Sequence, residues 1–308
     1  MNQQLLEELV GKNFHYYQTG QVANYIPALA EVNPKQLGMA IYDIKQNNLI
    51  QAGDASARFA IESISKVPVL LLAIEDNGLE TVFETINTEP TGFAFNSILN
   101  MEINQQKHPM NPFVNAGAIA TTSLIHGKNM DDKFDRILSF MKEICHDPAI
   151  TLNEEIYLSE SKTGDINRSL AYYMKGNQMI KGNVEEILDT YFKQCSVNVT
   201  ANGLAHLGAV LANKGIAPWN NTRIISEKSA TIVKSIMTTA GLYDESGEFS
   251  AHVGVPAKSG VGGGLMAAVP NCYGFGVFSP ALDNCGNSAA GIQLLKDVVA
   301  QLHVDIFD

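Results

Sequence analysis

The sequence is poor in features that mark several large protein classes. Only four of its 308 residues are cysteine, far apart and without a Cys-x-x-Cys pair, which favours reduced, mostly buried thiols over a disulfide framework or a zinc site. The seven histidines show no metal-ligand spacing such as His-Glu-x-x-His. No apolar run is long enough to cross a bilayer. We therefore expect no metal, no cofactor and no membrane partner.

Positive charge is also scarce. The chain carries 21 Lys and Arg against 32 Asp and Glu, a net charge of −11, so no basic cluster is available for a nucleic-acid partner. The first ten residues hold two glutamates and no basic residue, unlike a secretory signal peptide, and we expect a cytoplasmic protein. Neither Gly-x-Ser-x-Gly nor Gly-x-Gly-x-x-Gly occurs, which disfavours α/β-hydrolase and Rossmann enzymes.

Strand-like patterns stand near both ends of the chain, with helical patterns between them. The expected strands cover 37–44, 49–52, 249–255, 264–269 and 273–279. The expected helices cover 5–10, 134–144, 170–174, 184–194, 201–212, 226–237 and 287–303. No convincing strand pair lies within 80–234.

This order predicts an α/β chain of the α+β type. About five mostly antiparallel strands from both termini form one sheet flanked by helices, and a helical lobe covers one edge. We expect residues 1–78 and 236–308 to form the sheet-containing lobe and residues 79–235 the helical lobe. An active site then lies between the two lobes.

The stretch from Phe59 to Lys66 leads into an apolar segment at 67–74 and pairs two reactive side chains. Ser63 falls at the start of the helix-like run, and Lys66, three residues later, shares its face of a helix. A serine hydroxyl becomes a nucleophile when a base takes its proton, and a lysine kept neutral by burial is such a base. The pair predicts acyl-transfer chemistry, but an N-capping serine followed by a solvated lysine gives the same pattern.

Three further polar motifs come from distant parts of the chain. The run KSGVGGG at 258–264 forms either a glycine-rich hairpin or an edge strand whose backbone and Lys258 line a cleft facing Ser63. It leads into a strand, which disfavours a phosphate loop. Asn115 stands among apolar and small residues, as a hydrogen-bond hub or a ligand contact. Asn167 belongs either to a site or to a simple helix start.

In this order, Ser-x-x-Lys, an asparagine motif in a helical middle and a late Lys-Ser-Gly resemble the serine β-lactamases and penicillin-binding proteins. Longer strings make the chain similar to the glutaminase family within that superfamily. They are Asn-Tyr-Ile-Pro at 24–27, Asn-Pro-Phe-Val-Asn-Ala-Gly-Ala-Ile from 111, Gly-Leu-Tyr at 241–243, Val-Gly-Val-Pro-Ala-Lys-Ser-Gly-Val from 253 and Gly-Asn-Ser at 286–288. The resemblance covers about residues 20–290 and implies a β-lactamase-like fold.

The resemblance implies hydrolysis of L-glutamine to L-glutamate and ammonia, with Ser63 as nucleophile and Lys66 as general base. Glu160 and Tyr25 then hold the α-ammonium of the substrate. Asn115 and Asn167 hold its α-carboxylate. The other residues that match the family's substrate contacts are Ser63, Tyr191, Tyr243 and Val261. The N–H groups of Ser63 and Val261 form the oxyanion hole, and Tyr191 or Tyr243 relays a proton to ammonia.

One position departs from the family pattern. The family usually has glutamine immediately before the nucleophile, and this chain has Glu62. We place Glu62 among the substrate-binding residues, because its carboxylate can accept a hydrogen bond from the substrate ammonium. Its negative charge also favours protonated Lys66, so we expect an activity optimum shifted to alkaline pH.

Two alternatives stay open at this point. A related serine hydrolase acting on β-lactams or other amides shares the motifs. A glutamine-binding protein without turnover keeps the cleft and loses the chemistry. The resemblance also suggests a homo-oligomer, a tetramer or a dimer.

Overall fold

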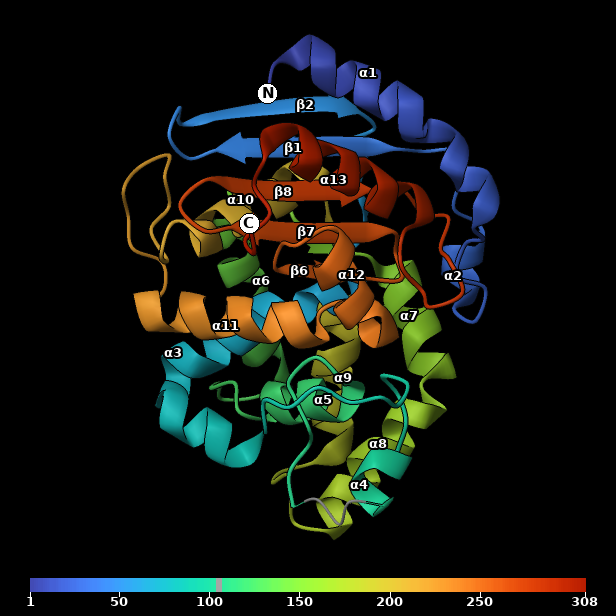
Figure 1. The fold of residues 1–308 in the computed structure, drawn as a ribbon. Coiled ribbons are helices and arrows are strands. Elements are labelled where there is room, and N and C mark those ends of the chain that lie inside the picture. Colours follow the sequence, from blue (N-terminus) through green and yellow to red (C-terminus); the bar gives the residue numbers. More distant parts are fainter. Residues whose placement is uncertain (104–106) are drawn as a thin grey trace.

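The structure is a computed structural model that describes residues 1–103 and 107–308. Its main sheet, in the upper half of Figure 1, has five strands in the order β2-β1-β8-β7-β6, and every neighbouring pair is antiparallel. The strands are β1 (Gly38–Asp43), β2 (Asn48–Gly53), β6 (Ala257–Ser259), β7 (Gly264–Val269) and β8 (Tyr273–Phe278). Because β1 pairs with β8, the two ends of the chain share one sheet.

Helices account for most of the remaining described residues. They are α1 (Gln3–Asn13), α2 (Pro27–Ala30), α3 (Lys66–Thr85), α4 (Leu99–Ile103), α5 (Asn115–Ser123), α6 (Met130–Ile144), α7 (Glu154–Thr163), α8 (Asp165–Gly176), α9 (Val184–Cys195), α10 (Ala201–Ala212), α11 (Glu227–Ala240), α12 (Ser246–His252) and α13 (Ala289–Leu302), with 3-10 turns η1 (Phe14–Thr19), η2 (Glu62–Ser65) and η3 (Tyr243–Glu245). Among the described helices, none combines the length and apolarity needed to span a membrane.

Polar residues set where many of these helices begin. At each such start a side-chain oxygen accepts a hydrogen bond from a backbone N–H of the first turn, which otherwise has no partner. The capping residues are Asn2, Asn129, Asn153, Asn183, Thr200, Ser226 and Ser288.

Both faces of the large sheet are covered. Successive side chains of a strand point to opposite faces, and in β1 Met39 and Ile41 pack with α1 and α13, while Ala40 and Tyr42 enter the core that contains α10. Figure 1 shows α13 in front of the sheet and α10 behind it. The approach of α10 requires glycine, because a Cβ at Gly276 of β8 would lie 1.9 Å from a backbone oxygen of α10.

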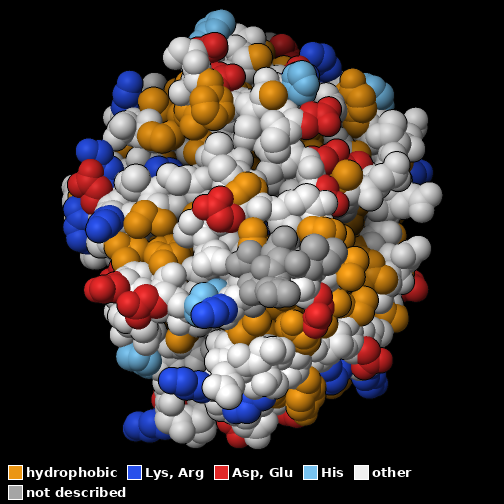
Figure 2. Space-filling view, turned by 60° about the horizontal axis from the view of Figure 1, so that its bottom comes forward, with side chains coloured by type: hydrophobic (Ala, Val, Ile, Leu, Met, Phe, Trp, Pro, Cys, Tyr) orange, Lys and Arg blue, Asp and Glu red, His pale blue; other side chains and the backbone are white. Residues whose placement is uncertain are grey.

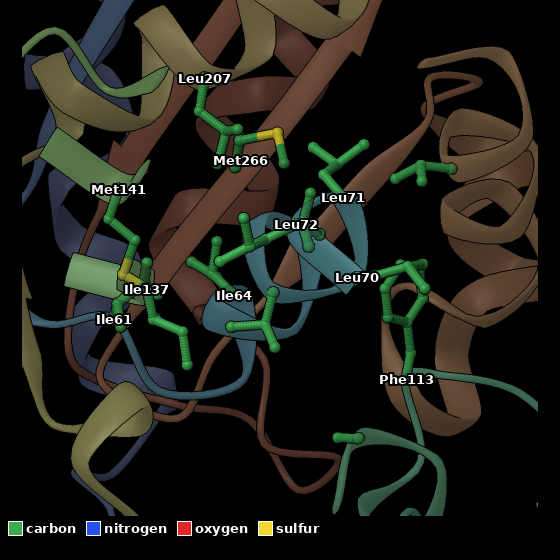
Figure 3. Close-up of a cluster of buried hydrophobic side chains, with 14 of the residues drawn as sticks. Ile61, Ile64, Leu70, Leu71, Leu72, Phe113, Ile137, Met141, Leu207 and Met266 are labelled. Atoms are coloured by element: carbon green, nitrogen blue, oxygen red, sulfur yellow. The ribbon is translucent and has the colours of Figure 1, made fainter. Parts of the chain in front are cut away.

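The larger core lies directly under η2. Ile61 and Ile64 are fully buried and point into a cluster of apolar side chains from α3, α6, α10 and β7 (Figure 3). Leu71 of α3 and Met266 of β7 belong to the same cluster. Burial of two such isoleucines contributes about 3–6 kcal/mol. The core therefore fixes the backbone on both sides of Ser63.

Two expectations about strands were wrong. Residues 249–255, expected as a strand, contain the end of α12, and the edge strand is β6 instead. Phe249 and Val253, four residues apart, both pack into the core beside α13, which is helical spacing. The helical middle of the chain also contains the short strands β4 (Thr151–Leu152) and β5 (Val197–Val199), which pair with β3 (Phe59–Ala60). Strands this short carry no readable period.

The predicted fold class is confirmed: helices flank a five-stranded antiparallel sheet built from both ends of the chain. The lobe boundaries at 78/79 and 235/236 stay a prediction. On the face seen in Figure 2, acidic and basic side chains are interspersed. That face shows no continuous basic patch of the kind that binds a polyanion.

Candidate active site

Ser63 lies in the 3-10 turn η2, immediately before α3. In a 3-10 turn, side chains three residues apart eclipse each other, which places Ser63 and Lys66 on the same side, as the sequence predicts. Ser63 is buried and makes no capping hydrogen bond at the start of α3. The reading as an N-cap with a solvated lysine is therefore wrong, since Lys66 is only 1% exposed.

A pocket of about 100 Å³ opens at Ser63, between η2, the start of α5, α7, α8 and α9. Its small size suits a small polar molecule. The predicted site residues that line it are Tyr25, Glu62, Ser63, Asn115, Glu160, Asn167, Tyr191 and Val261. The other two predicted residues, Lys66 and Tyr243, lie outside this lining.

Lys66 lies outside the pocket lining, and two hydrogen bonds fix its amine. Its Nζ donates to the Phe113 carbonyl oxygen at 3.0 Å and to Asn115 Oδ1 at 2.7 Å. Burial lowers the pKa of Lys66 to about 8, although Cys195, Glu62 and Glu160 act in the opposite direction. The upward effect of Glu62 expected from the sequence is thus present, but burial outweighs it.

Asn115 and Asn167 are joined across two helices. Asn115, the first residue of α5, donates from Nδ2 to Asn167 Oδ1 of α8 at 2.9 Å. Asn111 fixes the approach to α5, because its Oδ1 accepts from the backbone N–H groups of Phe113 and Val114. Asn115 is therefore a hydrogen-bond hub that also lines the pocket, and its role as a ligand contact stays a prediction.

The glycine-rich turn after β6 packs against η2. A Cβ at Gly260 would lie 2.7 Å from the Ile61 oxygen, and one at Gly262 would lie 2.2 Å from the Ala60 oxygen. Only glycine allows this approach, and it brings Val261 to the pocket beside Ser63. Among the backbone bonds of the described residues, the Val261 N–H has no acceptor.

Lys258 does not line the pocket, contrary to the cleft interpretation. It is fully buried in β6, and its Nζ donates to the carbonyl oxygens of Gly241 and Ser259. The same Nζ lies 4.6 Å from the ring centroid of Tyr243. Burial, and next the charge of Lys66, lower the pKa of Lys258 well below its ordinary value. Lys258 thus supports the segment that carries Tyr243.

Tyr243 has a strained backbone and an unsatisfied hydroxyl. Its φ of 52° lies in the left-handed region, where a non-glycine residue costs about 1–2 kcal/mol. The buried hydroxyl lies near Ser63 and Ser259 and has no hydrogen-bond partner among the described residues. Burial raises the pKa of Tyr243, so the phenol stays protonated at neutral pH. Its ring packs on Phe95, with centroids 4.6 Å apart.

The two remaining tyrosines differ in their surroundings. Tyr191 of α9 is buried and interacts with Cys195, one helical turn later. Tyr25 is 56% exposed as a whole, but its hydroxyl end is desolvated at the pocket, which raises the pKa of the phenol. The carboxyl groups of Glu62 and Glu160 also raise the pKa of both phenols. The two tyrosines therefore border the acidic side of the pocket.

Sequence reasoning missed Phe95, Asn96 and Cys195, which also line the pocket. Phe95 accepts the backbone N–H of Asn115 at 2.8 Å. The four cysteines are free, as expected, but only Cys145 and Cys195 are buried. No motif marks these lining residues, because tertiary packing alone brings them to the site.

Comparison with known proteins identifies the family. The family model for glutaminases matches residues 20–307. The chain belongs to the glutaminase family. Glutaminase 1 of Clostridium perfringens is 62% identical over 302 residues, 98% of each chain, and glutaminase 2 of the same organism is 51% identical, covering 98% of this chain and 99% of the relative.

Solved glutaminase structures share the fold. A probable glutaminase, YbaS, superposes with a TM-score of 0.93 at 37% identity and full coverage of both chains. A Bacillus subtilis glutaminase, in covalent complex with 5-oxo-L-norleucine, superposes with a TM-score of 0.90 at 35% identity, covering 99% of each chain. The predictions of a β-lactamase-like fold and of a glutaminase-family hydrolase are confirmed.

Proposed function

We propose that this chain hydrolyses L-glutamine to L-glutamate and ammonia through an acyl-enzyme on Ser63. The observation that carries the proposal is the pairing of Ser63, which lines a small pocket, with a buried Lys66 one turn later. The Bacillus subtilis relative reacts with 6-diazo-5-oxo-L-norleucine to give a covalent complex. This reaction supports the presence of a nucleophile in the family.

Lys66 suits the role of general base. A neutral amine has two N–H bonds and one lone pair, and the two hydrogen bonds to Phe113 and Asn115 use both N–H bonds. The lone pair is left to accept the Ser63 proton. With a pKa of about 8, Lys66 is partly neutral at physiological pH.

The pocket offers separate partners to the two ends of an amino acid. Glu160 and Tyr25 on the acidic side suit the α-ammonium, and the amides of Asn115 and Asn167 suit the α-carboxylate. The substrate side chain then extends toward Ser63. The Ser63 and Val261 N–H groups stabilise the oxyanion that forms on attack.

Departure of ammonia needs a proton. Tyr243 is the better donor in this proposal, because its protonated hydroxyl is buried, faces Ser63 and has no firm partner. Tyr191 lines the pocket and has Cys195 as its neighbour one helical turn later. Tyr191 then serves the substrate-binding side of the pocket.

We further propose that the enzyme works in the cytoplasm as a homo-oligomer, a tetramer or a dimer. The support is the family membership alone. Light scattering coupled to size-exclusion chromatography measures the oligomeric state, and a monomeric mass would contradict the proposal. Fractionation of cells that express the chain tests the location.

Ammonia release from L-glutamine by the purified protein tests the reaction. We expect release by the parent and by Ser235→Ala, an exposed serine of α11, and at least a thousandfold slower release by Ser63→Ala. Equal release by Ser63→Ala would mean that another group is the nucleophile. Glutamine binding without ammonia would favour the binding-protein alternative, and cleavage of a chromogenic cephalosporin would favour the β-lactam alternative.

A further inference from the structure

Two buried carboxyl groups meet in the pocket without a cation between them. Glu62 is 3% exposed and Glu160 is 9% exposed, both line the same pocket, and each affects the pKa of the other. No lysine, arginine or histidine is among the described residues that line the pocket. Lys66 acts on both carboxyls from behind but directs its hydrogen bonds to Phe113 and Asn115.

Such a pair does not hold two negative charges at neutral pH. Two buried carboxylates repel each other, and a hydrogen bond between two carboxyl groups requires a proton on one of them. Burial, and next the charge of Glu160, raise the pKa of Glu62 well above its ordinary value. The mutual hydrogen bond favours the neutral form of Glu62 and the ionised form of Glu160.

The backbone holds Glu62 in place at a cost. Its φ of 49° lies in the left-handed region, which costs about 1–2 kcal/mol for a residue with a Cβ. The Gly262 turn packs against the Glu62 side chain, so that a Cβ there would lie 3.3 Å from Glu62 Cγ. Glu62 Oε1 is buried and has no hydrogen-bond partner. The site therefore contains an acceptor that the free protein does not use.

We propose that Glu62 and Glu160 share one proton in the free protein and that the α-ammonium of glutamine displaces it, so that glutamine binding is coupled to proton release. The proposal rests on the proposed function, because the ammonium belongs to glutamine. The ammonium brings three N–H donors and one positive charge to the two carboxyls, including Oε1 of Glu62. A positive charge at contact lowers a carboxyl pKa by about 1–3 units. The displaced proton passes to solvent, and both carboxylates then accept from the ammonium.

Other titratable groups face the pair from the surrounding elements. They are Tyr25 before α2, Lys66 of α3, Tyr191 and Cys195 of α9, and Tyr243 of η3. Burial raises the pKa of each of the four acids, so they stay neutral near pH 7. Lys66 also titrates near the working pH. Replacement of Glu62 removes one upward influence on the pKa of Lys66 and moves that titration to lower pH, whereas it abolishes the shared proton.

The first test is the pH dependence of KM for L-glutamine. We expect the KM of the parent to fall by up to tenfold per pH unit as pH rises, until the free pair has lost its proton. Glu62→Gln removes this slope. Glu155→Gln, the same substitution at an exposed position of α7, keeps it. Titration of the substrate amine is common to all three proteins. The proposal would be overturned if the KM of the parent and the KM of Glu62→Gln had the same pH dependence.

The second test counts the protons directly. Titration calorimetry of L-glutamine into Ser63→Ala, repeated in buffers of different ionisation enthalpy, gives the number of protons released on binding. We expect a value approaching one at the pH of maximum release and near zero for Ser63→Ala combined with Glu62→Gln. Absence of release from Ser63→Ala between pH 6 and 9 would overturn the coupling, while ammonia production by the parent would leave the proposed function standing. Failure of the parent to produce ammonia would overturn the proposed function itself.

Discussion

Asn115 accepts a hydrogen bond from Lys66 Nζ at 2.7 Å through its Oδ1 and donates one from its Nδ2 to Asn167 Oδ1 at 2.9 Å. One amide thus connects the proposed base to a proposed contact for the substrate carboxylate. The arrangement fixes the orientation of Asn115, because Lys66 is a donor and must face the amide oxygen. It also means that a charge placed on Asn115 acts directly on Lys66.

Asn115→Asp tests this link with almost no change in shape. A carboxylate at contact favours the charged form of Lys66 and raises its pKa by about 1–3 units from about 8. The acidic limb of the kcat profile, which reports the substrate-bound enzyme, should move by that amount to higher pH. Asn96→Asp, on the pocket wall without a hydrogen bond to Lys66, should leave the limb in place. An unmoved limb in Asn115→Asp would show that Lys66 is not the group that titrates.

Gly262→Ala tests the turn that brings Val261 to Ser63. Its Cβ would lie 2.2 Å from the Ala60 oxygen, so the turn must move away from η2. Loss of one oxyanion donor lowers kcat by about 10²–10³, and we expect that loss in an ammonia-release assay with a folded protein. Gly247→Ala is the matched control, because its Cβ meets no atom within 4 Å and it lies in α12. Equal rates for both variants would remove the Val261 N–H from the mechanism.

Local signals in the sequence predicted the parts of this molecule that short stretches specify. The Ser63 and Lys66 pair depends on a three-residue spacing, and a 3-10 turn or a helix satisfies that spacing equally. β1 and β2 cover six residues each, long enough for a strand to be recognised between turn residues. Asn115 stood out because a polar amide among small apolar residues needs partners.

Features set by tertiary contacts escaped the same reasoning. Phe95 and Cys195 reach the pocket from segments that carry no motif. β4 and β5 have two and three residues, which is too short for a periodic signal. Phe249 and Val253 are residue types common in strands. They form part of a helical turn here because both side chains pack into the core beside α13. The Glu62 and Glu160 pair likewise required α7 to be placed against η2.

The Asp76 and Arg136 ion pair should stabilise the helical part of the fold. Asp76 is 6% exposed and binds the guanidinium with both oxygens, at 2.5 and 2.7 Å, while one oxygen also accepts the His126 N–H. Asp76→Asn should lower the free energy of unfolding by about 2–4 kcal/mol in urea titrations at pH 7. Asp165→Asn, in an exposed pair with Arg168, should change it by less than about 0.5 kcal/mol.

The pH dependence of that ion pair has a defined sign. Burial tends to raise the pKa of Asp76, but the hydrogen bonds of Arg136 and His126 outweigh it and hold the pKa below its ordinary value. Its stabilisation is therefore complete above the unfolded value of about 4 and is lost as pH falls through the folded value. The difference between parent and Asp76→Asn should shrink below about pH 4. A difference that stays constant down to pH 2 would contradict the ionised pair.

Tyr243 and Tyr191 should separate in their kinetic effects. The Tyr243 hydroxyl faces Ser63 and has no firm partner, so Tyr243→Phe should lower kcat by about 10²–10⁴ with KM changed only a few-fold, as expected when a proton donor is lost. Tyr191→Phe should mainly raise KM, because Tyr191 lines the pocket near Glu62 and Glu160, where the substrate ammonium is proposed to bind. Both changes remove one phenol oxygen, so they are matched in size, and Tyr191 is buried while Tyr243 is half-buried. The opposite pattern would assign the proton to Tyr191 and leave Tyr243 as a packing residue.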